Sequence, residues 1–226
     1  MPARNSRKKY IENSYYHIYN RGVEKRIIFE DEQDYKVFLS YLKQYLTPKN
    51  IDILQDKLSN ISTSYRERAQ IIKELRLNNF SDEISIIAYC LMPNHFHFLV
   101  KQKGQNSIDT FMNSIGTRYT MYFNKKYKRV GYLYQGVYKA VQVETDEQLL
   151  HLTRYIHLQS LITKGVALRA QPSSYEDYLG NTATEWVNSN GILKFFSKRN
   201  PRLSYEAFVN TKTQSYMNIS KFTIEY

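Results

Sequence analysis

The sequence predicts an α+β fold, a ferredoxin-like sandwich in which an antiparallel sheet carries helices on one face, with one further helix. Three observations support this class. The apolar pattern runs in the order strand, helix, strand, strand, helix, strand, helix. A chain of 226 residues can bury a core without metal or disulfide support. The only cysteine, Cys90, rules out an internal disulfide and fits a reducing cytoplasm.

The first half of the chain contains three strand patterns and one clear helix. Residues 15–20 (YYHIYN) are aromatic and β-branched and predict a strand that ends at Arg21-Gly22. Residues 31–46 have apolar side chains at helical spacing and are followed by Thr47-Pro48. The polar stretch 49–80 is predicted as a helical insertion. Residues 84–91 and 95–101 predict a hairpin around the turn 92–94.

The second half alternates helix, strand and helix. Ser107 is a candidate cap for a helix whose apolar stripe extends from Ile108 to Phe123. Residues 137–144 predict a strand. Thr145 and Gln148 form a capping-box pattern, and this helix is expected to end near Lys164-Gly165. We therefore expect one domain over residues 1–185 and a basic extension over residues 186–226.

Charge favours a polyanionic partner. Lysine and arginine number 32 against 21 acidic residues, a formal net charge of +11 that points to nucleic acid. The 21 tyrosines suit stacking on unpaired bases, and equally suit a core. No apolar run approaches the roughly 20 residues of a membrane span, so we expect no membrane association. Neither GxGxxG nor GxxxxGK[ST] occurs, which makes nucleotide-driven chemistry improbable.

Two histidines stand two residues apart on the strand 95–101. Because side chains alternate across a strand, His95 and His97 share a face, roughly 7 Å apart at the backbone. Two imidazoles at this spacing can converge on one metal ion, and Mn²⁺ suits such ligands as well as Mg²⁺ does. The alternative is an incidental pair of half-exposed histidines.

A third ligand must come from another element. Tyr155 and Gln159 lie four residues apart on the helix that starts at Thr145, and therefore share one face. A metal ion would satisfy the Gln159 carbonyl and lie beside the Tyr155 hydroxyl. A core tyrosine and a glutamine near the helix end explain the same spacing. Tyr119 and Tyr122 compete with Tyr155 but lie in an apolar stripe.

Several segments resemble one known family. Residues 92–97 (MPNHFH) resemble the MPNHxH strand of single-tyrosine HUH transposases of insertion sequences, which include the REP-associated tyrosine transposases. Further similar segments follow in the family's order and together cover roughly residues 15–180: YHIYNRG at 16–22, YFN at 122–124, GYLYQG at 131–136, RYIHLQ at 154–159 and SSY at 173–175.

The resemblance implies roles for four residues. In that family both histidines of the motif bind a divalent metal, the helix tyrosine attacks DNA, and the residue four positions later completes the metal site. These roles would fall on His95, His97, Tyr155 and Gln159, with Mg²⁺ or Mn²⁺ as the cofactor. The expected function is cleavage and rejoining of single-stranded or hairpin DNA through a 5′-phosphotyrosine. Relatives often read Asn-Pro where this chain has Gln159-Ser160, and the stretch 49–80 is longer than the usual connection.

Other roles and other functions stay open. The basic run and two nearby tyrosines are candidates for DNA contacts: Lys125, Lys126, Lys128, Arg129, Tyr132 and Tyr134. His17 and His157 are candidates for the base that takes the tyrosine proton. Alternatives to a transposase are a domesticated DNA-binding protein of the same fold and an HUH replication initiator or relaxase. Both a monomer and a homodimer are compatible with the sequence.

Overall fold

The computed structural model describes residues 9–161, 171–200 and 203–211. Its centre is a four-stranded sheet in the order β2-β3-β1-β4, in which every neighbouring pair is antiparallel. The strands are β1 (Tyr15–Arg21), β2 (Ile84–Met92), β3 (His95–Gln102) and β4 (Lys139–Val143). The fold is therefore α+β with the strand order of a ferredoxin-like split βαβ, as predicted.

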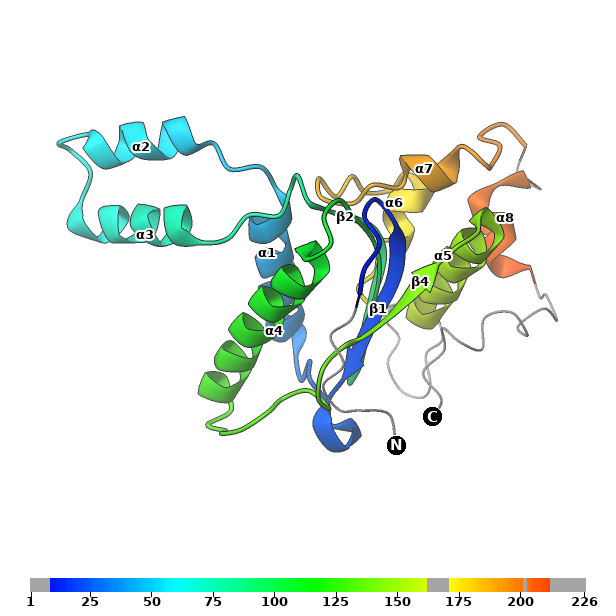
Figure 1. The fold of residues 1–226 in the computed structure, drawn as a ribbon, viewed down its shortest axis with the longest axis horizontal. Helices are drawn as coiled ribbons and strands as arrows, with labels where there is room; N and C mark the ends of the chain where they lie inside the picture. Colours follow the sequence, from blue (N-terminus) through cyan, green and yellow to red (C-terminus); the bar gives the residue numbers. More distant parts are fainter. Residues whose placement is uncertain (1–8, 162–170, 201–202, 212–226) are drawn as a thin grey trace.

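Two helices, α1 (Glu32–Leu46) and α4 (Ser107–Lys126), cover one face of the sheet (Figure 1). The core between them and the sheet is aromatic. Phe38 of α1 packs against Phe96 and Phe98 of β3, and Tyr119 of α4 packs edge-on against Phe38. Asp31 caps α1 by accepting a hydrogen bond from the backbone amide of Asp34. These two helices are the ones that the ferredoxin-like prediction requires.

The opposite face of the sheet is covered by α5 (Asp146–Leu161), which packs mainly on β2 (Figure 1). Leu152 and Ile156 of α5 are fully buried there with Leu99 of β3. Three short helices complete this second core: α6 (Tyr175–Leu179), α7 (Asn190–Leu193) and α8 (Tyr205–Asn210). The sheet is thus covered on both faces, and the additional helix α5 lies on the face opposite to α1 and α4.

Two details at the helix ends differ from expectation. Ser107 is the first residue of α4 and not its cap. Asn106 occupies the cap position without a side-chain bond, and Ser107 Oγ instead accepts a hydrogen bond from the Gly104 amide. At the start of α5, Thr145 Oγ1 accepts from the Gln148 amide, but the Gln148 side chain accepts from Glu144, one residue before the expected position. The predicted end of this helix, at 164–165, lies outside the described residues.

The segment 49–80 folds as an arm of two helices, α2 (Ile51–Ser59) and α3 (Tyr65–Arg76), which projects from the body (Figure 1). A capping box at Ser64 and Glu67 starts α3. Lys49 Nζ donates to the carbonyl oxygens of Glu74 and Leu77 at the base of the arm, and the Phe80 amide donates to Tyr45 O. The base of the arm is therefore fixed to the end of α1.

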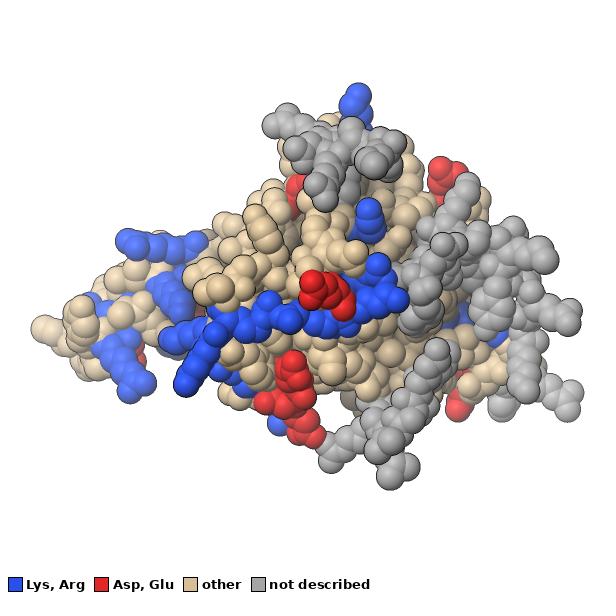
Figure 2. All heavy atoms as spheres, turned by 90° about the horizontal axis from the view of Figure 1, so that it is seen from below, with Lys and Arg blue, Asp and Glu red and all other residues tan. Residues whose placement is uncertain are grey.

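A short 3₁₀ helix, η1 (Val23–Lys25), follows β1 and lies at the same end of the molecule as the C-terminal end of α4 (Figure 1). Gly22 permits this tight turn, because a Cβ there would overlap the carbonyl oxygen of Arg26. Seen from below, lysine and arginine side chains form a band across the middle of the molecule and continue onto its left part (Figure 2). In the described part of the chain, every helix is too short or too polar to cross a membrane.

Candidate active site

His95 and His97 both lie on the face of the sheet that α5 covers, as the strand alternation predicts. Phe96 and Phe98 are buried on the other face, against α1 and α4. The two imidazole centroids are 5.0 Å apart with perpendicular rings. His97 is fully buried and His95 is nearly so. The HxH pair therefore faces the interior between the sheet and α5.

One ring nitrogen of each histidine is held by a neighbouring side chain. His95 Nδ1 lies 2.6 Å from Asn94 Oδ1, which can only accept, so His95 carries its proton on Nδ1. His97 Nδ1 lies 2.9 Å from His17 Nε2 on β1. Asn94 Nδ2 also donates to Lys25 O, which ties the turn before β3 to η1. Through these contacts both histidines can present Nε2, the second ring nitrogen, to a common ligand.

The histidine pair fits a metal ion. Burial, and then the charge of Arg21, lowers the pKa of His95 to about 4, and burial, followed by the charges of His17 and His95, holds the pKa of His97 well below its usual value. Both rings are therefore neutral at pH 7, the form that coordinates metals. His97 Nε2 is buried without a hydrogen-bond partner, which a metal ion would supply. The described residues contain no group of three His, Cys, Asp or Glu that could hold a metal ion, and the amide of Gln159 is the predicted third ligand.

Tyr155 packs edge-on against His97 and His17. Its ring centroid is 5.4 Å from that of His97 and 6.3 Å from that of His17, both in edge-to-face geometry. The residue is 9% exposed, so its ring is buried but within reach of solvent. Gln159 lies one helical turn further along α5 and is half-buried, on the same face of the helix as Tyr155.

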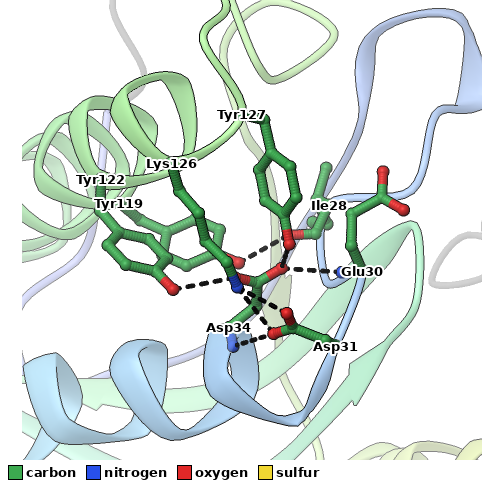
Figure 3. A network of polar contacts seen from close by, with 8 residues as sticks. All are labelled: Ile28, Glu30, Asp31, Asp34, Tyr119, Tyr122, Lys126 and Tyr127. Atoms are coloured by element: carbon green, nitrogen blue, oxygen red, sulfur yellow. Dashed lines mark hydrogen bonds and ion pairs between the residues drawn. The ribbon is translucent and has the colours of Figure 1, made fainter.

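The competing tyrosines lie on the other face of the sheet, in a polar network between α1 and α4 (Figure 3). The hydroxyl of Tyr119 donates to Ile28 O at 2.6 Å, and that of Tyr122 donates to Asp34 Oδ1 at 2.9 Å. Burial raises the pKa of both phenols. Their hydrogen bonds explain both residues structurally, and the sheet separates them from the HxH pair.

His157 is on α5 but belongs to the second core. Its Nδ1 lies 2.6 Å from the Tyr205 hydroxyl and its Nε2 lies 2.8 Å from Ser174 Oγ. Burial lowers its pKa to about 3. Both nitrogens thus have partners in the core, and the structure gives His157 a role in attaching α8 and the segment before α6 to α5.

The predicted DNA-contact residues have different environments. Lys125 and Lys128 are exposed. Lys126 Nζ lies 2.7 Å from a carboxylate oxygen of Asp31 and 2.7 Å from one of Asp34 (Figure 3), so its charge is already paired. Arg129 donates to Asn124 Oδ1. The exposed lysines and Arg129 are therefore better placed than Lys126 to contact a phosphate.

Two arginines that the sequence analysis did not select belong with this basic group. Arg21 is at the end of β1, paired in register with His95, and its charge helps to lower the pKa of that histidine. Burial and then the charge of Arg26 lower the pKa of Arg129, which places Arg26 close to the end of α4. Arg21 is part of the YHIYNRG segment, so the sequence motif already contains it. Its position beside His95 follows only from the pairing of β1 with β3.

Tyr132 and Tyr134 line a cavity of about 440 Å³ between α4 and residues 132–138. This cavity is on the α1 and α4 face and not on the histidine face, because its walls include Phe38 and Phe96. Tyr132 is 88% exposed and available for stacking. Tyr134 packs edge-on against Phe96, and burial raises the pKa of its hydroxyl.

Comparison with protein-family models gives one similarity. The sequence model of the family described as "Transposase IS200 like" matches residues 57–159, the segment that contains the HxH strand and the helix with Tyr155. Over this segment, somewhat less than half of the chain, the sequence is similar to that family of transposases.

Two solved structures are similar over most of the chain. A REP-associated tyrosine transposase bound to a REP hairpin has 10% identity and a TM-score of 0.41, covering 81% of this chain and 96% of its own. A putative transposase from Deinococcus radiodurans R1 has 16% identity and a TM-score of 0.28, covering 69% and 97%. No curated protein matches the chain.

Proposed function

We propose that this protein is a transposase that cleaves and rejoins single-stranded DNA with Tyr155 as the nucleophile. The observation that carries the proposal is the position of Tyr155, whose ring lies edge-on against His97 on the histidine face of the sheet. Tyr119 and Tyr122 are buried in the other core and hydrogen-bonded there. Tyrosine is one of the side chains that form covalent intermediates when a neighbouring base or metal ion activates the hydroxyl.

The proposed step exchanges one phosphodiester for another. Tyr155 Oη forms a bond to phosphorus while the bond from phosphorus to the 3′ oxygen breaks. The phenol loses its proton to solvent, and the departing 3′ oxygen takes up a proton to become a hydroxyl. The product is a 5′-phosphotyrosine, and attack by another 3′-hydroxyl reverses the step, so no external energy source is needed. The phenol is a weak nucleophile until it is deprotonated.

The metal in this proposal is Mg²⁺ or Mn²⁺. His95 Nε2, His97 Nε2 and the amide oxygen of Gln159 would hold it. When bound, a divalent ion polarises the scissile phosphate and stabilises the charge that develops on its oxygens. The protein contributes neutral imidazoles with their Nδ1 atoms already engaged, and Tyr155 and Gln159 lie one helical turn apart on the same face of α5.

The hydrogen bond between His17 and His97 limits the role of His17. For His97 Nε2 to bind a metal, His97 Nδ1 must carry the proton and donate it to His17 Nε2. The proton of neutral His17 is then on Nδ1, and the ring has no lone pair to accept a proton from Tyr155. We therefore propose that His17 positions His97 and does not act as the general base. The contacts of His157 with Tyr205 and Ser174 favour a structural role for that residue.

The DNA strand is proposed to leave the site along the basic residues of η1 and the end of α4. Arg21, Arg26 and Arg129 lie along this direction, and Lys125 and Lys128 are exposed nearby. Such side chains bind phosphates without reading sequence. Tyr132 offers an exposed ring for an unpaired base. These features favour single-stranded or hairpin DNA as the substrate.

The test is formation of a covalent protein–DNA adduct. Labelled single-stranded oligonucleotides are incubated with the protein and Mn²⁺ or Mg²⁺, and the adduct is mapped by mass spectrometry. We expect it on Tyr155, with loss of the adduct in Tyr155→Phe and in EDTA, and with DNA binding retained. Tyr122→Phe is the matched control and should still form the adduct. Binding without any adduct would favour the domesticated DNA-binding protein, and an adduct on another tyrosine would refute the assignment.

A further inference from the structure

The arm formed by α2 and α3 is the part of the molecule that the proposed chemistry does not use. It projects from the end of the sheet (Figure 1), and among the residues of its two helices only Ile71 is buried. A helix pair that buries so little apolar surface contributes little to the stability of the domain. An arm that is fixed at its base and exposed along its length presents its surface to a partner.

One face of α3 carries basic residues near both ends of the helix. At 100° per residue, Arg66, Lys73 and Arg76 fall within about 80° of one another on the helix. The positions between them on this face are occupied by Ala69 and Gln70, and all five side chains are exposed. The acidic residues of α3, Glu67 and Glu74, project about 80° to 100° away from Arg66 on the other side. The stripe therefore carries three positive charges and no negative charge.

Arg68, on the same helix, has a structural role within the arm. Arg68 is half-buried and donates to the carbonyl oxygens of Leu58, Asn60 and Thr63, which close the turn between the two helices. Its charge is therefore used within the arm. Arg66, Lys73 and Arg76 instead point outward from the pair.

We propose that the basic stripe of α3 binds the phosphate backbone of double-stranded DNA at a distance from the cleavage site, since the arm leaves the end of the sheet opposite to His95 and η1. The inference rests on the proposed function, in which DNA is the substrate, and adds a duplex-binding surface that the single-strand chemistry does not require. The 12 residues of α3 span about 18 Å, the length of about five base pairs, and the charge of duplex DNA along that length is high. Viewed from below, basic side chains on the projecting part and the band across the body lie on one face of the molecule (Figure 2).

The experiment compares hairpins that share one single-stranded segment but have stems of about 6 or about 18 base pairs, so that only the longer stem reaches the arm. The full chain with Tyr155→Phe is used, so that binding is measured without cleavage. The arm variant adds Arg66→Gln, Lys73→Gln and Arg76→Gln. The control variant adds Lys103→Gln, Lys194→Gln and Lys198→Gln, three exposed residues outside the arm with the same total charge change. Circular dichroism melting checks that both variants are folded.

We expect the arm variant to bind the long-stem hairpin at least 10-fold more weakly, with the slope of log affinity against log salt reduced by about 2 to 3. Its affinity for the short-stem hairpin should change by less than about 2-fold, and the control variant should lose equally on both hairpins. Equal losses for the two variants, or no loss for the arm variant, would overturn the proposal.

A change from dimer to monomer in the arm variant, measured by mass photometry, would instead make the arm a contact between copies of this chain and would also overturn the proposal. Failure of the proposed function has a separate signature, because it removes the adduct of the wild-type chain whatever the stem length.

Discussion

Individual side chains around the HxH motif determine which ring nitrogens face Tyr155. The Asn94 side-chain oxygen accepts a hydrogen bond from His95 Nδ1. His17 Nε2 is the hydrogen-bond partner of His97 Nδ1. Partners of this kind fix the orientation and tautomer of ligand histidines and commonly change metal affinity by 10- to 100-fold. Asn94 also donates to the backbone of η1, so the ring orientation depends on a second segment of the chain.

The first prediction concerns Asn94. Asn94→Ala removes the acceptor of His95 Nδ1, so His95 can rotate or change tautomer, and Mn²⁺ affinity measured by calorimetry should fall by about 10- to 100-fold. Asn113→Ala, an exposed position on α4, is the control and should leave Mn²⁺ affinity unchanged. If Asn94→Ala binds Mn²⁺ as tightly as the wild type, the orienting role of Asn94 is refuted.

For individual residues, the sequence predicts which side chains form the candidate site better than it predicts their hydrogen-bond partners. Alternation along a strand is enough to place His95 and His97 on one face, and helical spacing is enough to group Tyr155 with Gln159. The contact between His17 and His97 joins residues 80 positions apart in the chain. It depends on the pairing of β1 with β3, which no local pattern encodes.

Among the elements, α1 and α4 are joined by a network around one buried carboxylate (Figure 3). Asp34 is fully buried in α1 and accepts hydrogen bonds from Tyr122, Tyr127 and Lys126, as well as from the Glu30 amide. Every one of these donors except Glu30 belongs to α4 or its C-cap. The network therefore fixes the position of the helix end near which the basic residues lie.

The second prediction is that Asp34→Ala strongly destabilises the fold. Loss of the buried carboxylate leaves Lys126 with only Asp31 and removes the acceptor of two phenols, at a cost of about 3 kcal/mol in the free energy of unfolding. Urea denaturation measures this loss. Glu32→Ala serves as the control, because Glu32 is exposed and its ion pair with Lys36 is weak, so it should cost no more than about 0.5 kcal/mol. Similar losses in both variants would contradict a specific role for Asp34.

The elements themselves were largely predictable, and their arrangement less so. The strands, α1, α4 and α5 have strong apolar periodicity, and each lies within a few residues of its predicted limits, except for the predicted end of α5, which lies outside the described residues. The sequence did not show which face of the sheet α5 covers, since that depends on the path of the chain after β4. Ser107 was misplaced as a cap because a serine at a helix start is equally able to close the preceding turn, as it does with Gly104.

On the scale of the whole molecule, the two faces of the sheet differ in composition: one holds the larger core and the other holds the candidate site. The α1 and α4 face holds the larger aromatic core, and the α5 face holds the histidines and Tyr155. The basic residues Arg21, Arg26 and Arg129 follow the end of the sheet at which β1 passes into η1. A strand of DNA bound along this end would pass from the histidine face toward α4 without crossing the arm.

The last prediction tests this path through its salt dependence. A net charge of +11 predicts that DNA affinity falls steeply as salt rises, because bound phosphates release counterions. Each phosphate contact to a single strand contributes about 0.7 to the slope of log affinity against log salt. Arg26→Gln combined with Arg129→Gln should therefore reduce the slope by about 1.4 for single-stranded DNA, and weaken binding to a similar extent for unrelated sequences, as measured by fluorescence anisotropy. Lys103→Gln combined with Lys194→Gln removes the same charge elsewhere and should change the slope by much less. If the two double variants have the same slope, net charge alone governs affinity and the strand does not follow η1 and the end of α4.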